Sequence, residues 1–88
     1  MVQLPPSFDE LTGGRRREQL RGRTVGEVLA ALEARYPALR ARLRNETGQL
    51  LTLALVFLNS EDIRSMQGEQ TPVRAGDSIA IVPAVDGG

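Results

Sequence analysis

An unbroken apolar run in the second half of the chain constrains the fold more than any other feature. The run is Leu53–Leu58, and it lies in a predicted strand, Leu51–Leu58, whose two alternating sets of side chains are both apolar apart from Thr52. One set is Leu51, Leu53, Leu55 and Phe57, and the other is Ala54, Val56 and Leu58. A single amphipathic helix covers only one face of a small sheet, so the sequence predicts an exposed apolar patch on the other face. The sequence leaves open which set packs on the helix.

The helix that would cover this sheet is predicted to begin at Thr24. Thr24-Val25-Gly26-Glu27 matches a capping box, in which the threonine hydroxyl accepts from the N3 amide and the glutamate reaches back. Apolar residues then follow at helical spacing, at Val25, Val28, Leu29, Leu32 and Tyr36. Pro37 ends the helix, because proline disfavours α geometry in the residue before it. The same proline favours a second short helix with Leu39 and Leu43 on one face.

Shorter strand patterns complete a mixed sheet. Val2–Leu4 and Glu18–Leu20 are predicted to form an N-terminal hairpin, and Ile63 is predicted to start a short edge strand. Ile79–Val82 is predicted as the last strand, because β-branched residues dominate it. Its expected inward residues are Ile79 and Ile81, and its expected outward residues are Ala80 and Val82. A helix across one face of such a sheet is an α+β architecture.

The chain ends in a segment with no sign of a packed element. Pro83 has no N–H to continue the strand, and Gly87 and Gly88 carry no Cβ, so the backbone there is thin. The sequence therefore predicts a folded domain over residues 1–82 and a flexible, reactive tail over residues 83–88. Fully extended, the tail would reach roughly 20 Å, which suits insertion into a narrow channel where its terminal carboxyl reacts. A frayed terminus is the alternative interpretation.

The missing residue types exclude most self-contained catalysis. The 88 residues include no Cys, no His and no Lys, since all 11 basic residues are Arg. The chain therefore lacks a thiol nucleophile, an imidazole base, the commonest metal ligand and a side-chain amine. We expect no metal, no bound cofactor and no independent enzyme activity.

Charge and hydropathy exclude further classes of partner. The formal net charge is zero, so we expect neither nucleic acid nor a membrane as a partner. The basic cluster Arg15-Arg16-Arg17 is interpreted as a solvated strand edge or loop, because acidic residues elsewhere oppose it. No apolar run approaches the length of a membrane span and the N-terminus lacks an export pattern, so cytoplasm is the expected location.

The residues that carry a family resemblance lie in four stretches, in order along the chain. They are Thr24–Leu29 with Tyr36–Leu39, Val56–Asn59, Ala75–Asp77 and Ile81–Gly88. In these stretches the chain resembles the β-grasp sulfur carriers, a ubiquitin-like family that includes molybdopterin synthase small subunits and thiamine sulfur carriers. Asn59–Arg64 and Val82–Val85 are most similar to the member that serves cysteine biosynthesis in actinobacteria. The resemblance implies a β-grasp fold, with a mixed sheet of four to five strands and one main helix across one face.

The resemblance also implies a mechanism and its partners. An E1-like adenylating and sulfur-transfer enzyme would use ATP to join the Gly88 carboxylate to AMP, and sulfur would then displace AMP to leave a thiocarboxylate. That group would donate sulfur to a recipient enzyme, either a cysteine synthase-like enzyme or the large subunit of molybdopterin synthase. The tail residues implied in recognition are Pro83, Ala84, Val85, Asp86 and Gly87. The predicted partner-docking patch consists of Phe57, Ala80 and Val82.

Three functions compete on the sequence alone. A sulfur carrier is favoured, for cysteine biosynthesis or as the small subunit of molybdopterin synthase, in which case the chain would be an enzyme subunit. A ubiquitin-like modifier, joined to lysines of other proteins through Gly88, would use the same activated tail. A plain interaction domain with an incidental Gly-Gly end is the third. The chain departs from the family pattern at Asp86, which puts a charge where a small residue is usual.

Overall fold

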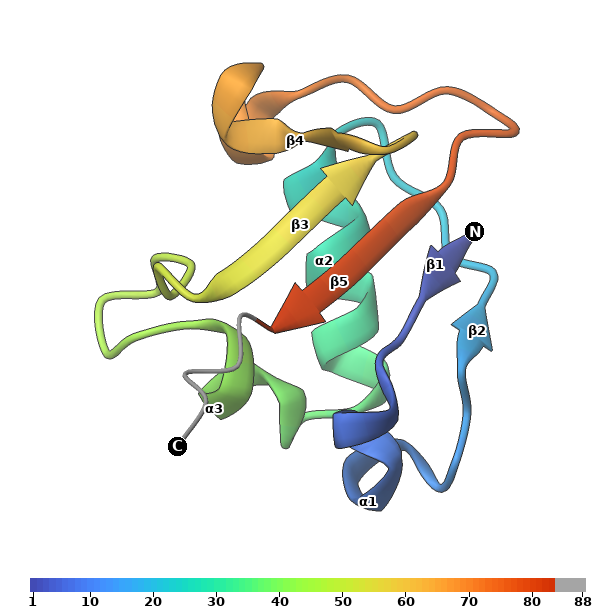
Figure 1. Cartoon of the computed structure of the whole chain (residues 1–88), viewed down its shortest axis with the longest axis vertical. Coiled ribbons are helices and arrows are strands. Elements are labelled where there is room, and N and C mark those ends of the chain that lie inside the picture. The colour runs from blue at the N-terminus through green and yellow to red at the C-terminus, as the bar shows by residue number, and fades with distance from the viewer. Residues whose placement is uncertain (84–88) are drawn as a thin grey trace.

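The computed structural model describes residues 1–83, which form a five-stranded mixed sheet with a helix across one face (Figure 1). The strands are β1 (Val2–Gln3), β2 (Arg17–Glu18), β3 (Ala54–Leu58), β4 (Glu61–Asp62) and β5 (Ile79–Pro83). The helices are α1 (Asp9–Thr12), α2 (Val25–Arg35) and α3 (Leu39–Leu43), with 3₁₀ turns η1 (Pro6–Phe8), η2 (Ile63–Ser65) and η3 (Gly68–Gln70). Residues 84–88 lie outside the described part of the chain.

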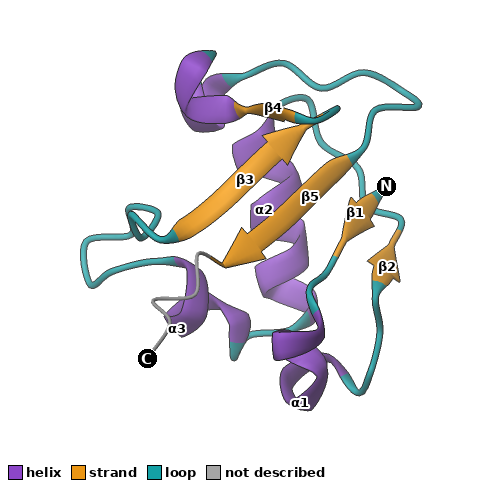
Figure 2. Ribbon diagram, viewed as in Figure 1, coloured by secondary structure: helices purple, strands orange, loops and turns teal. Residues whose placement is uncertain are grey.

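The sheet has the strand order β2-β1-β5-β3-β4, so the first and last strands lie side by side in its interior (Figure 2). β1 runs parallel to β5, and the other neighbouring strands are antiparallel. The longest ladder joins β3 to β5, from Ala54 opposite Pro83 to Leu58 opposite Ile79. This topology, with α2 packed across one face, confirms the α+β class and the β-grasp fold that the resemblance implied.

The start and end of α2 follow from the sequence signals at its two ends. The amide of Glu27 donates to the hydroxyl of Thr24 at 3.2 Å, and the Glu27 carboxylate accepts from the amide of Arg23 at 2.9 Å, so the capping box is formed. The helix ends at Arg35, and Tyr36 has an extended φ of −129°, as the following proline requires. Within residues 1–83, no helix is long and apolar enough to cross a membrane.

The packing of α2 decides which set of β3 side chains is buried. Val56 and Leu58 face α2 and are 2% and 5% exposed, so the set that contains them forms the inner face. On β5, Ile79 and Ile81 are buried in the same core, and the predicted inward and outward assignment of that strand is confirmed. The remaining core residues are Val2, Leu4, Phe8, Val25, Val28, Leu29, Leu32, Leu39, Leu43 and Ile63.

Two strand boundaries near β3 differ from the prediction. The strand begins at Ala54 and not at Leu51, because the residues before it form a turn in which the Ala54 amide donates to the Leu51 carbonyl at 3.0 Å. Ile63 does not start an edge strand. β4 is formed by Glu61–Asp62, and Ile63 opens η2, because the Asp62 carboxylate caps that turn by accepting from the Arg64 amide at 2.9 Å.

The ends of the sheet also differ from the prediction by a residue or more. β2 covers Arg17–Glu18 and not Glu18–Leu20, and the connection from β1 contains η1 and α1, which were too short to show as patterns in the sequence. β5 continues through Pro83, opposite Ala54. Pro83 has no N–H to donate, but no ladder hydrogen bond is lost. The N–H at this position would point toward the β1 side of β5, and β1 pairs with β5 only as far as Ala80.

Candidate docking face and tail root

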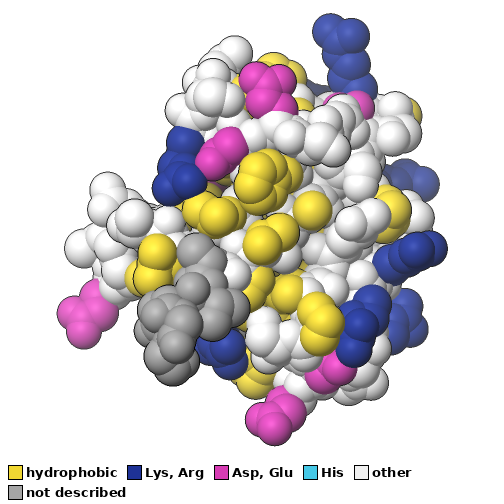
Figure 3. Space-filling model, in the orientation of Figure 1, with side chains coloured by type: hydrophobic (Ala, Val, Ile, Leu, Met, Phe, Trp, Pro, Cys, Tyr) yellow, Lys and Arg dark blue, Asp and Glu magenta, His cyan; other side chains and the backbone are white. Residues whose placement is uncertain are grey.

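The outer face of the β3–β5 pair carries an apolar patch that no described element covers. Val82 and Leu53 are exposed, by 44% and 53%, and Leu55, Phe57 and Ala80 are half-buried. Figure 3, in the orientation of Figure 1, shows apolar side chains gathered over β3 and β5 on this face. We call these residues, Leu53, Leu55, Phe57, Ala80 and Val82, the outer patch. The structure thus brings the three predicted docking residues, Phe57, Ala80 and Val82, together on one surface.

Strand register places the outer patch within rows that cross the sheet. Leu55 lies opposite Val82, and Phe57 lies opposite Ala80. The second row extends over all five strands, from Arg17 through Gln3, Ala80 and Phe57 to Asp62. Paired residues of neighbouring strands project to the same face. The apolar centre of the outer face is therefore bordered by a cation on β2 and by a carboxylate on β4.

The carboxylate at the β4 border is neutralised within the described part of the chain. The Arg64 guanidinium donates to Asp62 Oδ2 at 2.8 Å through Nη2 and at 3.2 Å through Nε, and its amide donates to Oδ1 at 2.9 Å. These bonds from Arg64 hold the pKa of the Asp62 carboxyl below its usual range. Arg64 Nη1 also lies 3.4 Å from the carbonyl of Thr52, so the pair connects β4 to the turn before β3.

The tail leaves the sheet beside the start of β3. Pro83 is the last described residue and is held opposite Ala54 at the end of the long ladder, next to Val82 of the outer patch. The structure therefore fixes the point from which the tail departs and the surface beside that point. The other predicted tail residues lie outside the described residues, and their roles stay predictions: Ala84, Val85, Asp86, Gly87 and Gly88.

A polar clasp holds the opposite end of β5. Asn59 Nδ2 donates to Asp77 Oδ1 at 2.9 Å, and Asn59 Oδ1 accepts from the amide of Ser78 at 2.9 Å. Asp77 Oδ2 accepts from the amide of Arg74 at 2.8 Å, and the amino group of Met1 donates to the Asp77 carbonyl at 3.0 Å. The clasp joins two stretches that the family resemblance had singled out separately. The sequence marked both as turns but gave no sign that their side chains meet.

The clasp also shifts the ionisation of its carboxyl group. The hydrogen bond from Asn59, then the bond from the Arg74 amide, hold the pKa of the Asp77 carboxyl below its usual range. Asn59 itself adopts a positive φ of 49°, a conformation that asparagine tolerates better than most residues. The turn between β3 and β4 is thus fastened to the start of β5, 18 residues away in the sequence.

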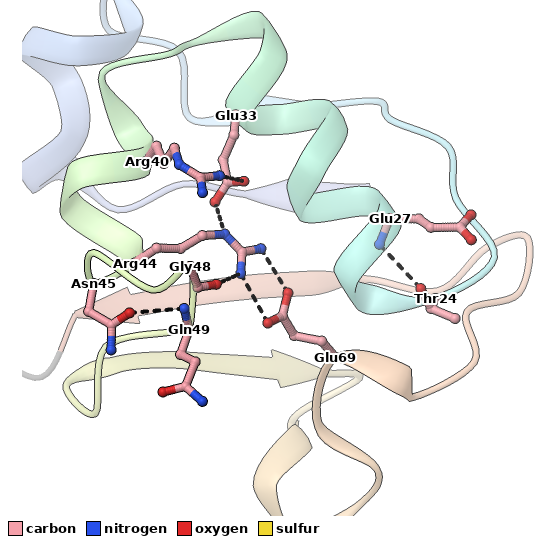
Figure 4. A network of polar contacts seen from close by, with 9 residues as sticks. All are labelled: Thr24, Glu27, Glu33, Arg40, Arg44, Asn45, Gly48, Gln49 and Glu69. Atoms are coloured by element: carbon pink, nitrogen blue, oxygen red, sulfur yellow. Dashed lines mark hydrogen bonds and ion pairs between the residues drawn. The ribbon is translucent and has the colours of Figure 1, made fainter.

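A second polar network fixes the segment that leads into β3 (Figure 4). The Arg44 guanidinium donates to Glu33 of α2 at 2.6 Å, to Glu69 of η3 at 2.7 Å and to the carbonyl of Gly48 at 2.9 Å. The side chains of Arg44 and Glu33 are each 8% exposed, so removal of either one would leave the charge of the other buried without a partner. Gly26 allows η3 to approach this closely, since a Cβ there would lie 3.1 Å from the Cβ of Glu69. The network therefore has a structural role, because it ties α2 and η3 to the segment before β3.

The described residues offer a surface rather than a catalytic centre. No group of three or more His, Cys, Asp or Glu side chains suited to a metal ion occurs within residues 1–83. The titratable groups of the clasp are hydrogen-bonded within the clasp, and those of the Arg44 network are paired within that network. The features that remain for function are the outer patch and the fixed departure point of the tail.

These features define the class to which the protein belongs: a β-grasp domain of the ubiquitin-like type, with an apolar sheet face beside the root of a Gly-Gly tail. The sequence profile of the ThiS family matches residues 2–88, and the chain belongs to that family.

Individual relatives agree with this assignment. The chain is 36% identical to sulfur carrier protein CysO of Mycobacterium tuberculosis over 89 residues, which cover 99% of this chain and 96% of that protein. It also superposes on a chain of the crystal structure of the Amycolatopsis orientalis BexX/CysO complex with a TM-score of 0.89, at 36% identity and with 99% and 97% of the two chains covered. Small archaeal modifier protein 1 of Methanosarcina acetivorans is similar in fold, with a TM-score of 0.88, 29% identity and 99% and 93% coverage.

Proposed function

We propose that this protein is a sulfur carrier whose Gly88 carboxylate is adenylated and then converted to a thiocarboxylate. The observation that carries the proposal is the match to a curated sulfur carrier over 99% of the chain, together with a family match that runs through Gly88. In this role the protein is a cosubstrate of other enzymes and not an enzyme itself. ATP is used by the activating partner, and this chain holds no cofactor of its own.

The chemistry explains why a partner is needed. A carboxylate is a poor electrophile, so the activating enzyme would direct the Gly88 carboxylate oxygen at the α-phosphorus of ATP and release pyrophosphate. A sulfur nucleophile would then attack the acyl carbon and expel AMP, which leaves a thiocarboxylate. Gly87 and Gly88 would keep the path to the active site free of side chains, while Pro83, Ala84, Val85 and Asp86 would span the partner's channel.

The outer patch would dock the partners that receive this tail. Phe57, Ala80 and Val82 present apolar surface beside the departure point of the tail, so a partner that covers the patch also faces the tail root. Burial of apolar surface supplies the favourable free energy of such docking, at roughly 25 cal/mol per Å². The two partners would be an E1-like adenylating enzyme and a recipient enzyme, which use the same surface in turn.

The favoured recipient is a cysteine synthase-like enzyme in cysteine biosynthesis. Support comes from the two similar CysO proteins, one of which was crystallised in a complex with BexX. Assembly with the large subunit of molybdopterin synthase is the alternative within the same family. Cytoplasm, expected from the sequence, stays the proposed location.

A protein modifier is the second candidate function. The chain is 30% identical over 90 residues to ubiquitin-related modifier 1 of Encephalitozoon cuniculi, and it shares its fold with small archaeal modifier protein 1. Such a modifier would transfer its activated Gly88 carbonyl to a lysine amine of another protein. This chain contains no Lys, so it would not form lysine-linked chains of itself.

The proposal is tested by pyrophosphate exchange with the adenylating enzyme of the same organism. We expect ATP-dependent exchange with the full chain and none after deletion of Gly88, because the reacting carboxyl would be displaced. Thermal unfolding should be unchanged, since the packed core lies within residues 2–81. A Gln70→Ser variant, which alters an exposed residue of η3 on the α2 side of the molecule and leaves both the outer patch and the tail intact, serves as the control. Full exchange with the Gly88 deletion would overturn the proposal.

A further inference from the structure

The charges of this neutral protein are unevenly distributed, and the edge of the sheet at β2 is strongly basic. Residues 15–23 include five Arg and one Glu, although the whole chain has 11 basic and 11 acidic residues. β2 lies within this segment. Figure 3 shows basic side chains along the side of the molecule where β2 runs. The sequence alone indicated only a solvated edge or loop for these arginines. The structure places them close to the outer patch, which that interpretation leaves unexplained.

The cations at this edge are only partly neutralised. Arg15 and Arg35 both approach the same oxygen, Oε2 of Glu18, at 3.6 and 3.5 Å, and the Tyr36 hydroxyl donates to that oxygen as well. The Glu18 side chain is 3% exposed, whereas Arg15 and Arg35 are 59% and 54% exposed. A buried carboxylate shared by two exposed guanidiniums leaves a net positive charge at the surface.

Arg17 brings that positive charge onto the outer face itself. It is exposed, and among residues 1–83 it forms no ion pair, whereas its neighbour Arg16 is bound to Asp9 at 2.7 Å. Arg17 starts the row that continues through Gln3 to Ala80. Neighbouring strands lie about 4.8 Å apart, so Arg17 is roughly 10 Å from the outer patch and within the footprint of a partner that covers the patch.

The two borders of the outer patch therefore differ in charge. The β2 border carries Arg17 on the outer face, and the pairs that Arg15 and Arg35 form with Glu18 lie beyond it, toward α2, while the β4 border carries Asp62, neutralised by Arg64. A partner that covers the whole row meets positive charge on one side only. Such an asymmetry favours a single docking orientation, and it accelerates encounter with a surface of opposite charge.

We propose that the protein surface that docks on the outer patch presents carboxylates to Arg17 on β2. The inference rests on the proposed function and adds the chemistry of the partner: an apolar centre with an acidic border on the β2 side. This arrangement orients the partner so that its active site faces the root of the tail at Pro83. A protein fits better than RNA, because the basic residues adjoin an apolar patch in which Phe57, the one aromatic residue among the described residues of the outer patch, is half-buried, whereas RNA-binding faces stack bases on several exposed rings.

The test compares charge changes at Arg17 with a matched change far from the tail. Adenylation would be measured with the adenylating enzyme of the same organism, for the wild type, Arg17→Gln, Arg17→Glu and Arg74→Glu. Arg74 is an exposed arginine in the turn before β5, at the end away from the tail root, and its reversal changes the net charge equally. We expect Arg17→Glu to lower kcat/KM about tenfold at about 0.02 M salt, and Arg17→Gln to lower it about threefold.

The salt dependence of the loss, and its comparison with Arg74→Glu, show whether the charge of Arg17 contributes to docking. At about 0.5 M salt the loss should shrink to less than about twofold, because ions screen exposed charges, and Arg74→Glu should stay within about twofold of the wild type throughout. Equal losses for Arg74→Glu and Arg17→Glu, or no loss for Arg17→Glu, would overturn the inference while the proposed function stands. Absence of adenylation of the wild type would overturn both. Salt-sensitive binding of a labelled single-stranded RNA that Arg17→Glu abolishes, with adenylation unaffected, would also overturn the inference.

Discussion

The two faces of the β3–β5 pair carry the same kind of side chain and differ in burial. On the inner face Val56, Leu58, Ile79 and Ile81 are each at most 5% exposed, whereas Val82 on the outer face is 44% exposed. The difference arises from α2, which packs on one face and leaves the other open. Residue type alone therefore does not separate the core from an exposed apolar surface. The position of the single long helix separates them.

The two ends of β5 differ in a similar way. The start of the strand is fastened by the clasp of Asn59 and Asp77, while its end at Pro83 pairs with Ala54 at the last position of the ladder. A strand that is anchored at one end and leads into the tail at the other fixes the point from which the tail departs, next to the outer patch. Stability and function should therefore respond to different substitutions along the same strand.

The largest expected difference separates adjacent residues of β5. Ile81→Ala should lower the free energy of unfolding by about 2–4 kcal/mol, because it leaves a cavity in the core. Val82→Ala, the corresponding change on the outer face, should lower it by less than about 1 kcal/mol, since Val82 is 44% exposed and its truncation leaves no enclosed cavity. Urea denaturation of both variants measures the difference. Similar losses would show that the outer face contributes to stability as the core does.

A charge placed on the outer patch should have a large effect on adenylation and a small effect on stability. Val82→Asp should lower kcat/KM for adenylation about tenfold or more, because docking would bury a carboxylate in apolar surroundings. The melting temperature should change by no more than a few degrees. Met66→Asp, at another exposed apolar residue that follows η2, is the control and should leave adenylation unchanged. Unfolding of Val82→Asp, or an equal loss in Met66→Asp, would contradict the docking assignment.

The smallest expected effect concerns the pH dependence of the clasp. The pKa of the Asp77 carboxyl lies below its usual range in the folded protein, and the hydrogen bond from Asn59 is the largest cause. A carboxyl with a lowered pKa stabilises the fold above its unfolded-state pKa, and this contribution is lost as the pH falls through the folded pKa. In Asn59→Ala the midpoint of the Asp77 titration, followed by NMR, should rise towards the ordinary value, and acid unfolding should depend less on this group. An unchanged midpoint would mean that the hydrogen bond does not set the pKa.

Much of the fold was predictable because its signals are local. The capping box at Thr24, the proline after Tyr36 and the alternation on β5 each specify an element through contacts within a few residues. The strand boundaries at Leu51 and Ile63 were predicted wrongly, since apolar β-forming residues there lie in a turn and in a 3₁₀ segment. Those segments are fixed by hydrogen bonds that composition does not reveal.

The candidate site was predictable to a different extent. The outer patch followed from a strand that is apolar on both sides and a single helix to cover it, and the structure supplied the choice of face. The Asn59–Asp77 clasp joins residues 18 positions apart, and the ion pair of Glu18 with Arg35 joins residues 17 positions apart on separate elements. Such contacts arise only from the tertiary arrangement.

The central claim, that Gly88 is activated and carries sulfur, is tested most directly by the intact mass of the protein. The chain would be produced together with its adenylating enzyme and a sulfur donor, and its mass and fragments would be determined beside those of the Gly88 deletion. The account predicts a mass gain that corresponds to the exchange of one oxygen for sulfur, located at Gly88 and absent from the deletion. An unchanged mass, or recovery of the chain only in conjugates with other proteins, would contradict it.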